Sequence, residues 1–185
     1  TFSLTPTDNM YITETQMDEA WMPGDMLPYG DMKISPAAGV LNYGQGLFEG
    51  MKAYRTSKDR VVFFRPEENA RRMQRGADRL KMPPVPESIF IDAVEQCVQA
   101  NLRWLPPMGK GAMYVRPLLM GSGPILGVAP APFYRFLVYV TPVGPYFKGG
   151  VKAIDLLISD NHHRAAPGGS GGVKAIGNYA PGMKP

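Results

Sequence analysis

Residues 47–64 read LFEGMKAYRTSKDRVVFF and carry the clearest local signal for a fold class in this chain. Two runs rich in apolar, β-branched and aromatic residues, 47–55 and 60–64, flank the polar segment 56–59. Strand-forming runs that are separated by a short polar turn are typical of a β-hairpin. We therefore expect strands at 47–55 and 60–64, joined by a turn at 56–59.

Two helices are expected directly after this hairpin. Apolar residues recur at helical spacing over 66–82 and again over 86–105, and a proline pair follows each run. The first helix would bury one face through Ala70, Met73, Ala77 and Leu80. Cys97 lies within the apolar stripe of the second helix, which predicts a packed structural thiol.

Further strands are expected on both sides of these elements, at 9–13, 31–34, 112–120, 133–141 and 151–159. Runs of strands followed by helices and further strands favour an α+β fold with a mostly antiparallel sheet. The proline- and glycine-rich stretch 142–150 resembles an interdomain linker. We thus expect a small N-terminal domain at 1–141, an interdomain loop at 142–150, and the beginning of a larger C-terminal domain at 151–185.

Composition excludes several classes of function. The net charge is +4, but the basic residues are spread along the chain, and the densest group alternates with acids on one predicted helix. A solvated helix face explains that group better than a nucleic-acid site. A single cysteine excludes an internal disulfide and favours an intracellular compartment, and no apolar stretch is long enough to span a membrane. Because the chain begins at Thr1 and not at Met, the sequence leaves open whether a targeting segment precedes it.

The predicted strand 112–120 carries one charge among apolar residues. Tyr114, Arg116 and Leu118 share a face of this strand, because side chains alternate across a strand. Arg116 faces the surface, forms a structural ion pair, or faces a cleft that receives a carboxylate. Pro117 lacks an N–H donor, which predicts an edge strand or a bulge.

Other candidate features are weaker. Phe48 and Gly50 share a face of the strand 47–55, and a glycine there indicates either a bulge or a close approach to the backbone. The glycine run 168–172 before Lys174 is either a flexible linker or a phosphate cradle, although it does not match a P-loop. His162 and His163 are adjacent, so they point apart, and we expect no metal site. These residues do not by themselves identify a reaction.

Seven blocks of the sequence, however, closely resemble those of the branched-chain aminotransferases of fold type IV in order and spacing. Their residues are most similar to those of the plant-like branch. The blocks are 41–54, 64–73, 114–119, 121–127, 142–147, 164–169 and 172–181. The resemblance covers nearly the whole chain. It departs at Lys52, which stands where some relatives have arginine, and in the less family-like tail 182–185.

The resemblance implies a homodimeric enzyme that uses pyridoxal 5'-phosphate to exchange the amino group between Leu, Ile or Val and 2-oxoglutarate. It implies that Lys174 forms a Schiff base with the cofactor and moves the α-proton, that Arg72 holds the cofactor phosphate, and that Tyr179 lies near the cofactor's 3'-oxygen. The substrate pocket would include Tyr43, Phe48, Gly50, Tyr114 and Tyr146, with Tyr43 reaching across the dimer interface. Arg116 would accept the second carboxylate of glutamate. Family members continue beyond Lys174, so this chain alone would form an incomplete active site.

Two alternatives remain at this stage. One is another enzyme of fold type IV, such as a D-amino-acid aminotransferase or an aminodeoxychorismate lyase. The blocks at 114–117 and 143–147 favour the branched-chain group. The other is a non-catalytic aminotransferase-like protein, which the retention of Lys174, Arg72 and Arg116 disfavours. Cytosol, plastid and mitochondrion are all left open as compartments.

Overall fold

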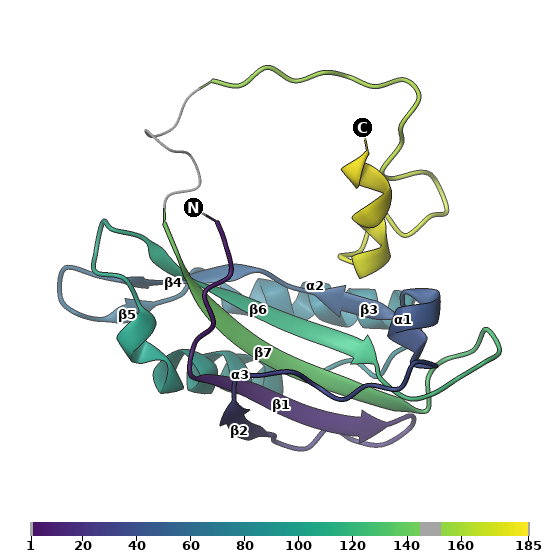
Figure 1. Ribbon diagram of the computed structural model, residues 1–185, viewed down its shortest axis with the longest axis horizontal. Helices are drawn as coiled ribbons and strands as arrows, with labels where there is room; N and C mark the ends of the chain where they lie inside the picture. The colour runs from purple at the N-terminus through teal and green to yellow at the C-terminus, as the bar shows by residue number, and fades with distance from the viewer. Residues whose placement is uncertain (1, 145–152, 185) are drawn as a thin grey trace.

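The structure, a computed structural model, describes residues 2–144 and 153–184. It contains a seven-stranded antiparallel sheet with the order β2-β1-β7-β6-β4-β5, in which β3 also pairs with β6 (Figure 1). This arrangement confirms the predicted α+β class. The strands are β1 (Asn9–Gln16), β2 (Asp25–Pro28), β3 (Gly46–Phe48), β4 (Met51–Arg55), β5 (Val61–Val62), β6 (Ala112–Gly121) and β7 (Phe133–Val143), and the helices are α1 (Gly39–Tyr43), α2 (Pro66–Arg79) and α3 (Glu87–Ala100).

The hydrophobic core lies between the sheet and helices α2 and α3. On β6 the odd-numbered residues point into it: Met113, Val115 and Leu119 are fully buried. Phe90 of α3 packs against Phe136 of β7, with ring centroids 5.8 Å apart. Strand alternation therefore sends the even-numbered residues of β6 to the opposite face, where the C-terminal segment lies beside β3 (Figure 1).

The predicted hairpin is present, but its first strand is interrupted. β4 and β5 pair as expected, with Tyr54 opposite Val62. β3 and β4 both follow β6 in one register, since Phe48 lies opposite Leu118 and Met51 opposite Val115. At the interruption, the Glu49 N–H donates to the Pro117 carbonyl at 2.8 Å.

The edge position predicted from Pro117 is wrong. β6 is interior, with β7 on one side and β3 and β4 on the other. Pro117 has no N–H to return the hydrogen bond from Glu49, so the ladder breaks there while the strand keeps its place.

Both helices are shorter than predicted. α2 ends at Arg79 because Lys81 adopts a left-handed conformation, with φ at 52°. α3 ends at Ala100, and a 3-10 turn, η1 (Leu102–Trp104), follows it. The buried face of α2 is confirmed at Ala70, Met73 and Ala77. Cys97 is buried as predicted, and burial raises the pKa of its thiol to about 12.

Two predicted strands are wrong. Residues 31–34 form no strand, because β1 pairs with the earlier segment β2 through the Met10–Leu27 register. Among residues 153–159, the described part of the strand predicted at 151–159, no strand forms, and Leu156, Leu157 and Ile158 are exposed. Within 2–144 and 153–184, no strand lies beside this last segment to supply the hydrogen bonds that a strand needs. Of the predicted linker, 142 and 143 belong to β7, whereas 145–150 lie outside the described residues.

Candidate active site

The C-terminal segment joins the sheet next to β3. The Phe48 N–H donates to the Lys174 carbonyl at 3.2 Å, and Leu47 forms a bridge with Ala175. Two short 3-10 turns follow, η2 (Ile176–Asn178) and η3 (Ala180–Met183). This pairing fixes the backbone of Lys174 against the strand that carries Phe48.

The loop before Lys174 is tied down by its own polar groups. The Asn178 side chain donates to the carbonyls of Ser170 at 2.8 Å and Val173 at 2.9 Å. Arg79 of α2 donates to the Gly168 carbonyl at 3.1 Å. The glycine run is therefore a folded turn held against α2, which argues against the flexible-linker alternative.

Lys174 lies beside the rings of Phe48 and Tyr179, and the Tyr179 hydroxyl is its hydrogen-bond partner. Its Nζ donates to Tyr179 Oη at 3.0 Å and sits 4.2 Å from the centre of the Phe48 ring. The Phe48 and Tyr179 rings are 4.8 Å apart. Partial burial raises the pKa of Tyr179, but hydrogen bonds from Lys174 and Arg164 lower it overall. The site thus favours a strongly hydrogen-bonded, electron-rich phenol beside the amine.

Arg164 is a site residue for which the sequence analysis proposed no role. Its guanidinium lies 5.6 Å from the centre of the Tyr179 ring and donates to the Gly171 carbonyl at 3.0 Å. Its position ten residues before Lys174, within the block 164–169, was the available signal.

One face of the sheet carries the even-numbered residues of β3, β4 and β6. It brings together Phe48, Gly50, Tyr114 and Arg116, as strand alternation predicts. Arg116 Nη2 donates to Tyr114 Oη at 2.9 Å, and its guanidinium lies 4.4 Å from the centre of the Phe48 ring. Arg116 forms no ion pair with any carboxylate of the described residues. A cavity of about 180 Å³ adjoins Tyr114 and Arg116. Of the alternatives for Arg116, this geometry favours the arginine that faces a cleft.

Arg72 projects from α2 toward the interruption between β3 and β4. Its Nε and Nη2 donate to the two carboxylate oxygens of Glu49 at 2.7 and 2.5 Å. These hydrogen bonds raise the pKa of Arg72, and the nearby Tyr179 adds a smaller electrostatic contribution. The Arg72 side chain remains 46% exposed, within electrostatic range of Tyr179.

One predicted pocket residue is not brought to this cluster, and a second lies outside the part of the chain that the structure describes. Tyr43, the last residue of α1, donates its hydroxyl to the Leu126 carbonyl. Tyr146 lies outside the described residues. The cluster within this chain accordingly comprises seven of the predicted residues: Phe48, Gly50, Arg72, Tyr114, Arg116, Lys174 and Tyr179.

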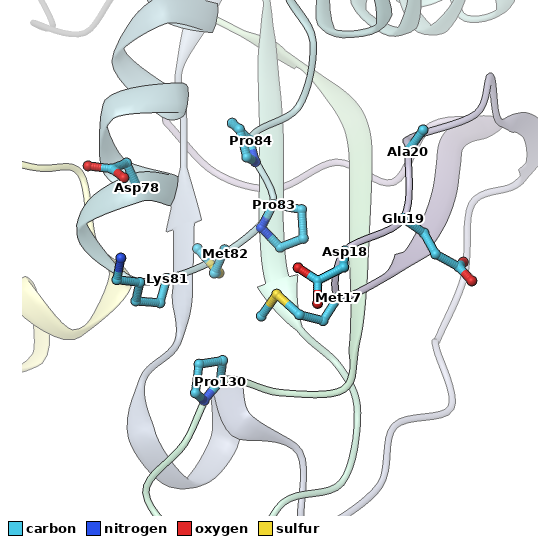
Figure 2. Close-up of a pocket in the computed structure, with 10 residues that line it drawn as sticks. All are labelled: Met17, Asp18, Glu19, Ala20, Asp78, Lys81, Met82, Pro83, Pro84 and Pro130. Atoms are coloured by element: carbon cyan, nitrogen blue, oxygen red, sulfur yellow. The ribbon is translucent and has the colours of Figure 1, made fainter.

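A larger cavity, of about 700 Å³, lies elsewhere (Figure 2). Met17 and Asp18, which follow β1, face Lys81 and Met82, which follow α2, across this cavity (Figure 2). It contains none of the predicted site residues, so size alone does not locate the site. Within 2–144 and 153–184, no three metal-ligating side chains cluster. No helix in that part of the chain is long and apolar enough to cross a membrane.

The fold resembles that of solved aminotransferases of fold type IV. Escherichia coli branched-chain amino acid aminotransferase matches with a TM-score of 0.65 and 22% identity, over 94% of this chain and 53% of that one. A second branched-chain amino acid aminotransferase, from T.th. and solved with pyridoxamine 5'-phosphate, matches with a TM-score of 0.61 and 26% identity, over 79% of this chain and 43% of that one. The fold and the lysine-centred site thus define a fold type IV aminotransferase domain.

Sequence similarity narrows this class. No family model matches the sequence. Branched-chain amino acid aminotransferase 2, chloroplastic, of Humulus lupulus is 57% identical over 183 residues, which are 99% of this chain and 45% of that protein. A methionine aminotransferase of Arabidopsis thaliana is 47% identical, over 97% of this chain and 51% of that protein. Over 99% of its length the chain is thus similar to a plant branched-chain aminotransferase, and it spans about half the length of the curated relatives it matches.

Proposed function

We propose that the protein carrying this chain transfers amino groups between branched-chain amino acids and 2-oxoglutarate, with pyridoxal 5'-phosphate held by Lys174 as a Schiff base. One observation carries the proposal: the Lys174 amine and the Arg116 guanidinium lie 4.2 and 4.4 Å from the centre of the same Phe48 ring. A group that reacts with an aldehyde and a group that binds a carboxylate thus share one site.

The described residues fit the cofactor. Pyridoxal 5'-phosphate presents an aldehyde, a phenol oxygen and a phosphate. Lys174 supplies the amine for the aldehyde, and Tyr179 supplies a hydrogen-bonding group beside it. Arg72, half exposed and within electrostatic range of Tyr179, supplies the cation for the phosphate. The pyridine ring of the bound cofactor supplies an electron sink for the bond that breaks at the α-carbon.

The chain's own groups divide the remaining work. Tyr179 Oη holds Lys174 Nζ in place, and Lys174 is the group that moves the α-proton of the amino acid. Phe48, Gly50 and Tyr114 form one wall of the pocket for an apolar side chain. Arg116 lies at the edge of that wall, where it can pair with the second carboxylate of glutamate.

We propose that the remaining parts come from outside this cluster. Tyr43 would enter the pocket of a second subunit, so the working unit would be a homodimer. Tyr146 would contribute to the pocket from the interdomain loop after β7, which would join the small domain to a larger domain that begins at 151.

Borohydride trapping tests the proposal. The complete natural protein is incubated with pyridoxal 5'-phosphate, reduced, digested and mapped by mass spectrometry. We expect a phosphopyridoxyl group on Lys174 and none on Lys184, which is close in sequence and serves as an internal control. A folded protein that stays unmodified at Lys174 would contradict the proposal and favour the non-catalytic alternative.

Substrate assays separate the remaining enzymes. We expect turnover of L-leucine, L-isoleucine and L-valine with 2-oxoglutarate. L-methionine is the informative competitor, because a relative is a methionine aminotransferase. Turnover of D-alanine without turnover of L-leucine would assign the chain to a different fold type IV enzyme.

A further inference from the structure

Glu49 is a charged residue in an otherwise apolar setting. It lies at the interruption between β3 and β4 with no exposed surface, on the face of the sheet that α2 covers. Its sequence neighbours on that face, Leu47 and Met51, belong to the hydrophobic core. Taking a carboxylate out of water costs free energy unless it is paired and hydrogen-bonded.

The carboxylate is fully satisfied by α2. Oε1 accepts from Arg72 Nε at 2.7 Å, and Oε2 accepts from Arg72 Nη2 at 2.5 Å and from Asn69 Nδ2 at 2.8 Å. Asn69 and Arg72 are three residues apart, so they lie on one face of α2. A well-packed apolar pair often stabilises a core as much as such an ion pair does. Stability alone therefore does not account for a carboxylate at this position.

The geometry of the pairing leaves Arg72 with one free edge. A guanidinium has five N–H donors in a planar fork. Glu49 occupies the side formed by Nε and Nη2, which leaves both protons of Nη1 and the second proton of Nη2. The Arg72 side chain is 46% exposed, so that remaining edge is open to a second anion.

We propose that Glu49 is a positioning residue, which holds Arg72 by one edge so that the other edge faces a phosphate monoester bound beside Tyr179. This inference rests on the proposed function, because the phosphate is that of the cofactor. Glu49 touches neither cofactor nor substrate. It removes the rotational freedom of the arginine before the phosphate arrives, which lowers the entropic cost of binding.

The test compares the affinities of the complete protein for pyridoxal 5'-phosphate and for pyridoxal, which lacks the phosphate. Both are measured by titration of the visible absorbance of the bound compound. Glu49→Gln keeps the shape of the side chain and removes its charge. We expect the variant to weaken binding of pyridoxal 5'-phosphate about tenfold, on the scale of one charge-assisted hydrogen bond, and to change pyridoxal binding by about twofold or less.

Two further variants control the test. Glu68→Gln removes a carboxylate on the exposed side of α2 that pairs with Arg71 at 3.0 Å, and the affinity ratio should stay at the wild-type value. Asn69→Ala removes one donor from Glu49 and leaves Arg72 intact. A smaller loss in the same ratio is expected, and this variant decides the question if Glu49→Gln does not fold.

The outcomes separate the two proposals. If the wild type binds neither compound at Lys174, the proposed function is wrong. If the wild type prefers the phosphorylated compound and the ratio is unchanged in Glu49→Gln, or in Asn69→Ala where Glu49→Gln does not fold, the positioning role is overturned while the function stands. A general loss of stability would weaken binding of both compounds alike, so it would leave the ratio unchanged.

Discussion

Gly50 should be the least replaceable glycine of the site, because a side chain there has no room. An added Cβ would lie 2.1 Å from Tyr114 Oη and 2.9 Å from Tyr114 Cζ. The Tyr114 ring is itself constrained, since Arg116 bonds its hydroxyl at 2.9 Å and the Phe2 ring lies 5.0 Å away. Gly50→Ala must therefore displace the ring and disturb the Arg116 contact.

The change in the free energy of unfolding follows from one stabilising and two destabilising contributions. Gly50 has no left-handed φ, so alanine fits its backbone and would by itself stabilise the fold by about 0.4–1 kcal/mol. Overpacking costs about 1–3 kcal/mol, and the loss of a hydrogen bond to a charged group adds about 1.5 kcal/mol at its lower limit. The net expectation is a loss of about 1.5–4 kcal/mol in the free energy of unfolding.

Urea denaturation measures this loss, and a double-mutant cycle assigns it. In a Tyr114→Ala background the clash is absent, so Gly50→Ala should be close to neutral or stabilising. Gly30→Ala is the matched control, because a Cβ at Gly30 meets nothing within 4 Å. The reasoning is refuted if Gly50→Ala is as stable as Gly30→Ala, or if its cost is the same with and without the Tyr114 ring.

Three further outcomes are expected. Because burial raises the pKa of the Cys97 thiol to about 12, iodoacetamide at neutral pH should label Cys97 in unfolded protein and leave it intact in folded protein, as peptide mass spectrometry will show. Asn101→Ala should cost about 2–4 kcal/mol in urea denaturation, because the buried Asn101 side chain accepts from the N–H groups of Asp8 and Asn9 at 2.9 Å. Hydrogen bonds from Arg103 hold the pKa of Asp8 below its usual value, so their stabilisation is present above about pH 4 and is lost as the pH falls through the lowered pKa. The melting temperature of the wild type should consequently fall more steeply below about pH 4 than that of Asp8→Asn.

Local periodicity predicts most of the fold. The buried faces of α2 and α3 and the strands β6 and β7 are visible in the sequence because each element buries one regular face. The same logic predicts the wall of the candidate site, since alternation alone places Tyr114 with Arg116 and Phe48 with Gly50. That the two pairs adjoin depends on the register between β3, β4 and β6, which is a long-range property.

The errors arise where long-range pairing decides the outcome. The segment 31–34 and β2 are both short and half polar, and only the pairing of β2 with β1 distinguishes them. The apolar run at 153–159 resembles a strand locally, yet within the described residues it has no neighbour to pair with. The general rarity of proline within sheets predicts an edge position for Pro117. Its missing donor instead faces Glu49, where the ladder can break without loss of the strand.

The buried ion pair of Glu49 could have been predicted from the alternation of residues in the sequence. Alternation puts position 49 on the same face as Leu47, Met51 and Ala53, all of which are buried. A carboxylate on a buried face needs a cationic partner. The arginines of α2 are the candidates that follow in the sequence. Of the arginines there, Arg72 lies one turn before the buried Gly76, at the border of the buried face, whereas Arg71 and Arg75 lie further from that face. A charged residue on the buried face of a strand therefore predicts an oppositely charged partner nearby. For Glu49 that partner is Arg72, the residue proposed to hold the phosphate.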